Sequence, residues 1–144
     1  MPCTVTRVVD GDTLDCDPIG RIRLLGMDTP EPAQAPFGAR ATEALRAMAP
    51  PGTPLLAEGD VEARDRYGRA LAYLWREMKD GPVQLNWALV RTGYAVLLTY
   101  PPNVRHVEAF TAAQAAARDE GVGLWAVDGF ACIPRDFRAR RCGR

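Results

Sequence analysis

Three short stretches of the chain combine acidic and basic residues in a way that suits phosphate chemistry. They are Val-Asp-Gly-Asp-Thr (9–13), Arg-Leu-Leu-Gly-Met-Asp-Thr-Pro-Glu (23–31) and Asp-Arg-Tyr-Gly-Arg (65–69). Carboxylate oxygens are the ligands that a hard divalent cation such as calcium prefers. Guanidinium groups grip phosphate oxygens through two parallel hydrogen bonds. The stretches therefore predict one site that binds a cation and a phosphodiester together.

The acidic residues predict an incomplete cation shell. We expect a hairpin to bring Asp12, which opens a strand, and Asp28, which closes the next, to one rim. Two carboxylates, a backbone carbonyl and water leave positions open for substrate and a nucleophilic water. Glu31 would orient or deprotonate that water for in-line attack on phosphorus. Taken alone, each fragment is more typical of an ordinary turn, strand exit or exposed loop.

The basic residues of these stretches are candidates for binding the phosphate. Arg23 interrupts an apolar strand, so its side chain faces solvent, an ion pair or a ligand rather than a barrel core. Arg69 follows Gly68, which lets the backbone turn sharply before a strand. Both arginines would neutralise charge that builds on phosphate oxygens in the transition state. Solvent-facing arginines are common on strands, so neither residue is specific by itself.

Aromatic residues give a weaker signal. Tyr67 and Tyr100, with Trp75 or Tyr94, would each contribute about 1–3 kcal/mol by stacking on a base. Packing in the core or across strands is the commoner role of such residues. The single histidine, His106, has no obvious catalytic partner, and capping or packing is its expected role. The sequence has no phosphate-cradling glycine loop that ends in Lys-Ser/Thr.

The elements that must position these residues form an α+β pattern. Alternating apolar residues and turn signals predict strands, and Ala/Leu periodicity predicts helices that begin and end at Asn, Gly and Pro residues. We expect Gly11 to supply a positive φ in the first hairpin, and Asn103 to cap the last helix. The order matches a five-stranded OB-type Greek-key barrel with three helices. The strands are predicted at residues 4–10, 13–17, 21–27, 54–58 and 69–76, and the helices at 38–48, 83–92 and 104–120.

Bulk properties fit one compact domain. The chain has 144 residues and a net charge of zero, so no global basic field indicates a nucleic-acid partner. It lacks an apolar run long enough to span a membrane. We expect a domain at residues 1–128 and a C-terminal tail at 129–144. The tail is rich in arginine, and a solvated, partly disordered end is favoured over a phosphate-binding role.

The four cysteines leave the compartment open. An even count permits two disulfides in three connectivities. Cys132 with Cys142 would staple the tail, and Cys3 with Cys16 would clip the first hairpin. Buried free thiols are the alternative, since cysteine also packs as a small apolar residue. The first residues lack a signal-peptide pattern. A secreted or periplasmic location is slightly favoured over the cytoplasm only if a leader was removed.

The ordered motifs resemble those of the thermonuclease (staphylococcal-nuclease-like) family over about residues 4–126. The family pattern Asp-Gly-Asp-Thr stands at 10–13, Arg-Leu-x-x-x-Asp-Thr-Pro-Glu at 23–31 and Asp-x-Tyr-Gly-Arg-x-Leu-Ala-Tyr at 65–73. Further matches are Asn86, the run 88–91, Gly93, His106 and Leu124-Trp125.

The resemblance implies an OB-fold endonuclease that hydrolyses DNA and RNA with calcium. It assigns Asp12, Asp28 and the carbonyl of Thr29 to the metal. It assigns Glu31 to the attacking water. Arg23 and Arg69 would bind the scissile phosphate, Tyr67 would hold a terminal phosphate or sugar, and Tyr100 would lie along the base pocket.

This chain departs from the family in its substrate-facing parts. The segment after Glu31, residues 32–36, is about five residues shorter than in the archetype and has no lysine. Leu98 replaces a second tyrosine of the base pocket.

We expect a monomer that acts on nucleic acid, with single strands preferred, and that does not bind membranes. The main alternative is a non-catalytic module that binds single-stranded nucleic acid, but such a module would lack the carboxylates present here. A scaffold or protein-interaction domain has no support in the sequence.

Overall fold

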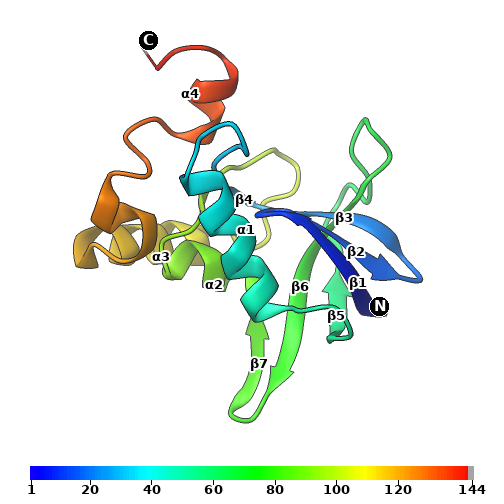
Figure 1. The fold of residues 1–144 in the computed structure, drawn as a ribbon. Helices are drawn as coiled ribbons and strands as arrows, with labels where there is room; N and C mark the ends of the chain where they lie inside the picture. Colours follow the sequence, from blue (N-terminus) through cyan, green and yellow to red (C-terminus); the bar gives the residue numbers. More distant parts are fainter. Residues whose placement is uncertain (143–144) are drawn as a thin grey trace.

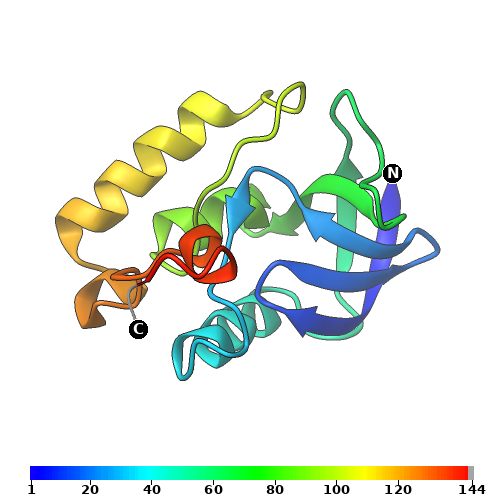
Figure 2. The same ribbon diagram turned by 90° about the horizontal axis from the view of Figure 1, so that it is seen from above.

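A computed structural model describes residues 1–142 as a small barrel with helices packed along one side (Figures 1 and 2). None of the helices in this part of the chain is long and apolar enough to cross a membrane. The strands are β1 (Pro2–Asp10), β2 (Thr13–Asp17), β3 (Gly20–Leu24), β4 (Met27–Asp28), β5 (Pro54–Glu58), β6 (Ala70–Met78), β7 (Gly81–Gln84) and β8 (Val96–Leu97). The helices are α1 (Phe37–Met48), α2 (Leu85–Arg91), α3 (Val107–Glu120), the 3-10 helix η1 (Gly123–Val127) and α4 (Pro134–Arg138).

The barrel closes through a parallel pair of strands. The sheet order is β3-β2-β1-β5-β6-β7, and β3 also pairs with β6. In that closing pair Arg23 lies beside Leu71, and across the antiparallel β2–β3 pair Arg23 faces Thr13. The predicted α+β fold with a five-stranded OB-type barrel is confirmed, and the three predicted helices correspond to α1, α2 and α3.

The first hairpin reaches the rim of the barrel because Gly11 has no side chain. A Cβ atom on Gly11 would lie 2.6 Å from Oγ1 of Thr29 and 2.8 Å from Cβ of Ala41. The expectation that Gly11 adopts a positive φ is wrong, because Gly11 is absent from the positive-φ glycines of the described residues. Close approach is therefore the reason for a glycine here. The neighbouring carbonyl of Asp12 accepts the Leu24 N–H at 2.9 Å, which fixes the turn against β3.

The helices are joined to the barrel by a buried asparagine. Asn86, at the start of α2, is fully buried. Its side-chain amide donates to the carbonyls of Leu25 (2.9 Å) and Ala72 (3.1 Å), and its oxygen accepts the Leu74 N–H at 2.9 Å. These bonds satisfy backbone groups that would otherwise be unpaired in the interior, and they hold α2 against β6.

Several local predictions need correction. Asp28 does not close β3; it lies in the separate strand β4, where it pairs with Val96 of β8. The segment at 81–84 forms β7 rather than a turn leading into a helix. Asn103 does not cap α3, because its side chain bonds the backbone of Glu62 instead. For His106, of which capping or packing was expected, the structure confirms packing: it makes no side-chain cap bond at the N-cap of α3, and its ring packs edge-on against Tyr73 at 4.4 Å.

The C-terminal tail is folded rather than solvated as far as residue 142. Cys3 is bonded to Cys16, and Cys132 to Cys142. The second disulfide encloses α4, a helix that the sequence did not predict. Figure 2 shows α4 (red) beside β4 and above α1. The tail therefore lies over the rim that carries the acidic residues, and Arg144 lies outside the described residues.

Candidate active site

Arg23 brings the two predicted metal ligands together. Its Nη2 atom lies 3.4 Å from Oδ2 of Asp12 and 3.3 Å from Oδ1 of Asp28. Its Nη1 atom donates to the carbonyls of Leu24 and Met27, the latter at 3.0 Å. The arginine thus faces an ion pair, one of the three environments expected for it. Its position between the carboxylates would also place a cationic fork beside any phosphate bound at this rim.

Thr29 completes an oxygen-rich rim. Its hydroxyl donates to Oδ2 of Asp12 at 3.3 Å, and the Thr13 hydroxyl donates to Oδ1 of Asp12 at 2.9 Å. Asp28 and Thr29 are almost completely buried, with relative exposures of 1% and 3%. The structure therefore brings together Asp12 from the turn before β2, Arg23 from β3, Asp28 from β4 and Thr29 directly after β4.

Glu31 joins this group through a residue that the sequence reasoning did not select. Arg138, the last residue of α4, donates from Nη2 to Oδ2 of Asp28 at 2.6 Å and from Nη1 to Oδ1 at 3.2 Å. The same Nη1 also donates to Oε1 of Glu31 at 2.7 Å. One guanidinium therefore bridges the predicted metal ligand and the predicted base.

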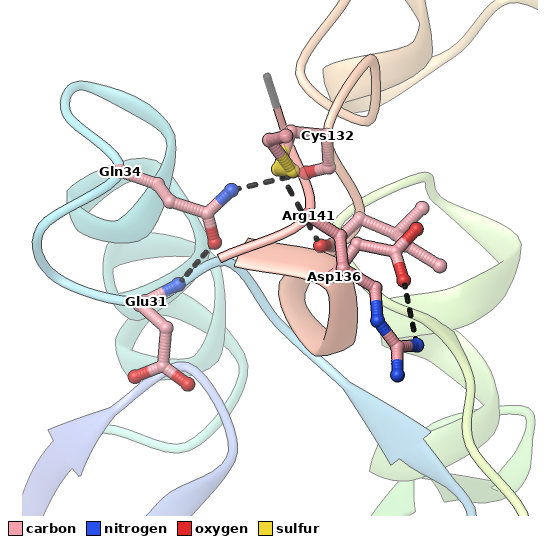
Figure 3. The surroundings of a disulfide bond; sticks show 7 residues. Glu31, Gln34, Cys132, Asp136 and Arg141 are labelled. Atoms are coloured by element: carbon pink, nitrogen blue, oxygen red, sulfur yellow. Dashed lines mark hydrogen bonds and ion pairs between the residues drawn. A yellow bond between two sulfur atoms is a disulfide. The ribbon is translucent and has the colours of Figure 1, made fainter. Parts of the chain in front are cut away.

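The loop after Glu31 is tied to the tail. The Glu31 N–H donates to Oε1 of Gln34 at 2.9 Å, and Nε2 of Gln34 donates to the carbonyl of Cys132 at 3.0 Å (Figure 3). Figure 3 shows Gln34 reaching from the loop to the backbone beside the disulfide. Gln34 and Arg138 were both missed, because each has its partners about a hundred residues away in the sequence.

The carboxyl groups differ in how easily they ionise. Burial raises the pKa of Asp12, but the charge of Arg23 and hydrogen bonds from its neighbours outweigh burial and leave it below its ordinary value. Burial raises the pKa of Asp28, and the opposing interactions with Arg138 and Arg23 do not fully offset it. Burial and the adjacent Asp12 carboxylate raise the pKa of Asp10 to about 7. Asp10 is a further member of the site, and the Asp-Gly-Asp motif was the signal that could have indicated it.

Arg69 lies at the end of the loop that leads into β6, and its polar contacts among the described residues are with Asp65 rather than with the rim carboxylates. Its Nε donates to Oδ2 of Asp65 at 2.7 Å, and its N–H donates to Oδ1 of Asp65 at 2.9 Å. Gly68 has a φ of +83°, which confirms the sharp turn expected before β6. The guanidinium carbon of Arg69 lies 5.5 Å from the centre of the Tyr67 ring, which is 68% exposed. Tyr67 and Arg69 therefore form a second, solvent-facing group.

Tyr100 does not join either group. Its side chain is 65% exposed, and its backbone forms a bridge with Asn103. Of the eight predicted site residues, four meet at the rim and Glu31 is linked to them by Arg138. Arg69 and Tyr67 contact each other, with the Arg69 guanidinium over the Tyr67 ring.

Comparison with known proteins identifies the family to which this architecture belongs. A family model described as Staphylococcal nuclease homologue matches residues 21–127, which contain most of the barrel and two of the three motifs in full. The chain belongs to this family.

Relatives of this staphylococcal nuclease homologue carry related names. It is 36% identical over 130 residues to the Thermonuclease of Staphylococcus intermedius, covering 84% of this chain and 74% of the relative. It is 34% identical to the Thermonuclease of Staphylococcus hyicus over the same share of this chain and 73% of the relative. It is 33% identical to Endonuclease YhcR of Bacillus subtilis (strain 168) over 97% of this chain, which spans only 13% of that protein. Together, these relatives support a nuclease, a hydrolase of phosphodiester bonds.

The donors at the rim fit the divalent cation that the family suggests in general terms. Asp28 supplies buried and Asp12 partly buried carboxylate oxygens that share contact with one Arg23 nitrogen, and oxygen-only donors suit calcium. Within residues 1–142, no group of three or more His, Cys, Asp or Glu side chains is clustered so as to hold a metal. A cation here would therefore rely on two carboxylates, backbone carbonyl oxygen and water.

Proposed function

We propose that the protein is a calcium-dependent endonuclease that hydrolyses DNA and RNA by attack of water on phosphorus. The observation that carries this proposal is the meeting of Asp12 and Asp28 around Arg23 at a rim that also presents Thr29. Acidic oxygens beside a fixed guanidinium suit a bound cation and a phosphate at the same time.

Asp12, Asp28 and the carbonyl of Thr29 would hold the calcium. When bound, calcium supplies positive charge that neutralises a phosphate oxygen and makes nearby water more acidic. The protein's own residues orient the reactants. Arg23 would donate to a non-bridging oxygen of the phosphate, where its charge is worth most as the transition state forms.

Glu31 is proposed as the general base. Its carboxylate would accept a proton from the attacking water while the phosphorus–oxygen bond on the opposite side breaks. Arg69 would donate to another phosphate oxygen. Asp65 holds Arg69 through Nε, which leaves the outer nitrogens of the guanidinium for the substrate.

Tyr67 and Tyr100 are proposed to contact the nucleotide. Both rings are more than half exposed, so both are accessible to a base or sugar. The short loop at 32–36 and the buried Leu98 offer fewer contacts to a duplex, which favours a single-stranded substrate. We further propose that residues 1–128 form the nuclease domain, that 129–144 are an appended tail, and that the protein is a monomer.

A digestion assay tests the proposal. Purified protein should degrade denatured DNA and RNA with calcium, and a chelator should abolish the activity. Magnesium should support binding with little turnover, because it demands near-ideal octahedral geometry and gives up its water ligands reluctantly, whereas calcium accepts an irregular oxygen shell. Digestion that continues at full rate with the chelator would contradict the proposal. Binding without digestion in calcium would favour the alternative, a non-catalytic module for single-stranded nucleic acid.

A further inference from the structure

The tail places a positive charge on the oxygens that a metal ion would use. Asp28 is nearly inaccessible, and both of its carboxylate oxygens accept hydrogen bonds from Arg138. Glu31, which is less deeply buried, accepts another from the same side chain at 2.7 Å. A buried carboxylate needs a cationic partner or a metal, since an unpaired buried charge is costly. Arg138 provides that partner from a helix outside the barrel.

The tail is held where Arg138 can reach the site. The Cys132–Cys142 disulfide closes a loop that contains α4, and Gln34 bonds the carbonyl of Cys132. Phe130 and Ile133 pack on the cluster formed by Val96 and Leu124. The backbone that carries Arg138 is therefore anchored to the domain at its start by packing and hydrogen bonding.

The Arg138 side chain also has room to leave. A cavity of about 690 Å³ lies between the loop and the tail, and its lining includes Glu31, Pro32, Phe137 and Arg138. The Arg138 side chain is 38% exposed, so it can exchange its carboxylate partners for water. An anchored backbone with a releasable side chain is suited to a contact that opens and closes.

We propose that Arg138 is a built-in competitor of the divalent cation, which occupies the Asp28 and Glu31 carboxylates until calcium displaces it. This inference rests on the proposed calcium site. Calcium can then bind only to those molecules in which Arg138 has withdrawn from the carboxylates. The apparent affinity for calcium is therefore the intrinsic affinity multiplied by the fraction of such molecules. Arg138 thereby sets the calcium concentration at which the site fills.

Calcium binding by the intact protein tests the competition. Isothermal titration calorimetry should show that R138A binds calcium about tenfold or more tightly than the wild type, since charge-assisted hydrogen bonds to a buried carboxylate no longer have to be broken. R138K, which keeps one charge but not the fork, should fall between them. The calcium concentration that gives half-maximal digestion should fall from wild type through R138K to R138A.

R141A is the matched control. Arg141 lies in the same disulfide loop, is more exposed, and faces Asp136 at 4.0 Å instead of the site. Its removal lowers the charge of the tail equally and should leave calcium affinity within about twofold of wild type. Equal, measurable affinities for wild type and R138A would overturn the competition while leaving the calcium site intact. Absence of calcium binding in every variant would overturn the calcium site, and the competition with it. Weaker binding by R138A would show that Arg138 supports the metal site rather than opposing it.

Discussion

Individual side chains at the rim act in a network rather than as separate ligands. Arg23 contacts both Asp12 and Asp28, and Arg138 contacts both Asp28 and Glu31. Asp28 is the residue that the two arginines share. Because it is buried, any change in its partners alters the electrostatic balance of the whole group. The roles of these residues are therefore best separated by variants that keep the shape of the side chain.

Glu31→Gln is such a variant. The amide cannot accept the proton of water as a base, so the catalytic rate with calcium should fall about 10²- to 10⁴-fold. The dissociation constant for a short single-stranded oligonucleotide should change by less than about threefold, because the phosphate contacts of Arg23 and Arg69 remain. Single-turnover digestion and fluorescence anisotropy measure the two quantities.

The control for this variant is E43Q. Glu43 is exposed on α1 and pairs only with Arg46 among the described residues, so its substitution should leave both quantities unchanged. Full activity of E31Q would contradict the assignment of Glu31 as the base.

The sequence predicted residues whose partners are close along the chain. Asp12 lies in the turn before β2, and Arg23 and Asp28 lie on β3 and β4; the hairpin signal was enough to expect Asp12 and Asp28 at one rim. Arg138 was not predicted, because it lies 110 residues from Asp28 and its contact depends on how the tail folds back. Nothing in its local sequence distinguishes it from the other tail arginines.

At the scale of elements, the loop between β5 and β6 is organised by its aspartates. Asp65 accepts hydrogen bonds from the N–H groups of Tyr67 and Arg69 and from the Arg69 side chain. Asp60 accepts from the Tyr73 hydroxyl at 2.7 Å. This loop presents both Tyr67 and Arg69, so its order determines whether the second half of the proposed substrate site is formed.

The ionisation of Asp65 should therefore control this loop in acid. Burial raises its pKa, but the hydrogen bonds and charge of Arg69 outweigh burial and hold the pKa below the ordinary 3.8. A depressed pKa means that the carboxylate stabilises the folded loop above the ordinary value, and that this stabilisation is lost as the pH falls through the lower, folded value. The backbone amide resonances of Tyr67 and Arg69 should shift with a midpoint below pH 3.8.

The D65N variant provides the comparison. Its amide resonances should show no such transition, and its loop should be less ordered at neutral pH. A midpoint above 3.8 in the wild type would contradict the interaction between Asp65 and Arg69 seen here.

Helices and strands were predicted correctly where local sequence signals agreed with one another. The predictions failed where contacts with residues distant in the sequence determined the structure. Apolar periodicity was sufficient for α1, α2 and α3, whose exposed and buried faces alternate along the chain. The hairpin strand β7 was missed because Gly81 and Pro82 indicate a turn, and only pairing with β6 makes the segment a strand. Asn103 was predicted to cap a helix, but its side chain forms hydrogen bonds with the backbone of Glu62, which lies 41 residues away in the sequence.

At the scale of the whole molecule, positive and negative side chains balance, and no excess of positive charge is available to attract nucleic acid. The net charge is zero, so attraction to nucleic acid must come from a few local arginines instead of a broad basic field. The tail arginine nearest the site is already paired with Asp28 and Glu31. We therefore expect few phosphate contacts in the complex.

This expectation has a measurable consequence in salt. If only Arg23 and Arg69 neutralise phosphates, the logarithm of the binding constant for single-stranded DNA should fall with the logarithm of salt concentration at a slope of about −1.4. Titrations between about 50 and 200 mM NaCl with E31Q, which should bind without cleaving, measure the slope. A slope steeper than about −3 would mean that the arginines of the tail also contact the strand.

The link between Gln34 and the carbonyl of Cys132 joins the shortened loop to the tail. Neither segment is independent of the other: without the tail, the Gln34 amide would lose its acceptor, and without the short loop, the tail would lose a contact that holds it over the rim. Across the family, loop length and tail should therefore have evolved together. Relatives with a longer, lysine-bearing loop should lack a counterpart of α4, and relatives that retain a glutamine at this position should retain the cysteine pair.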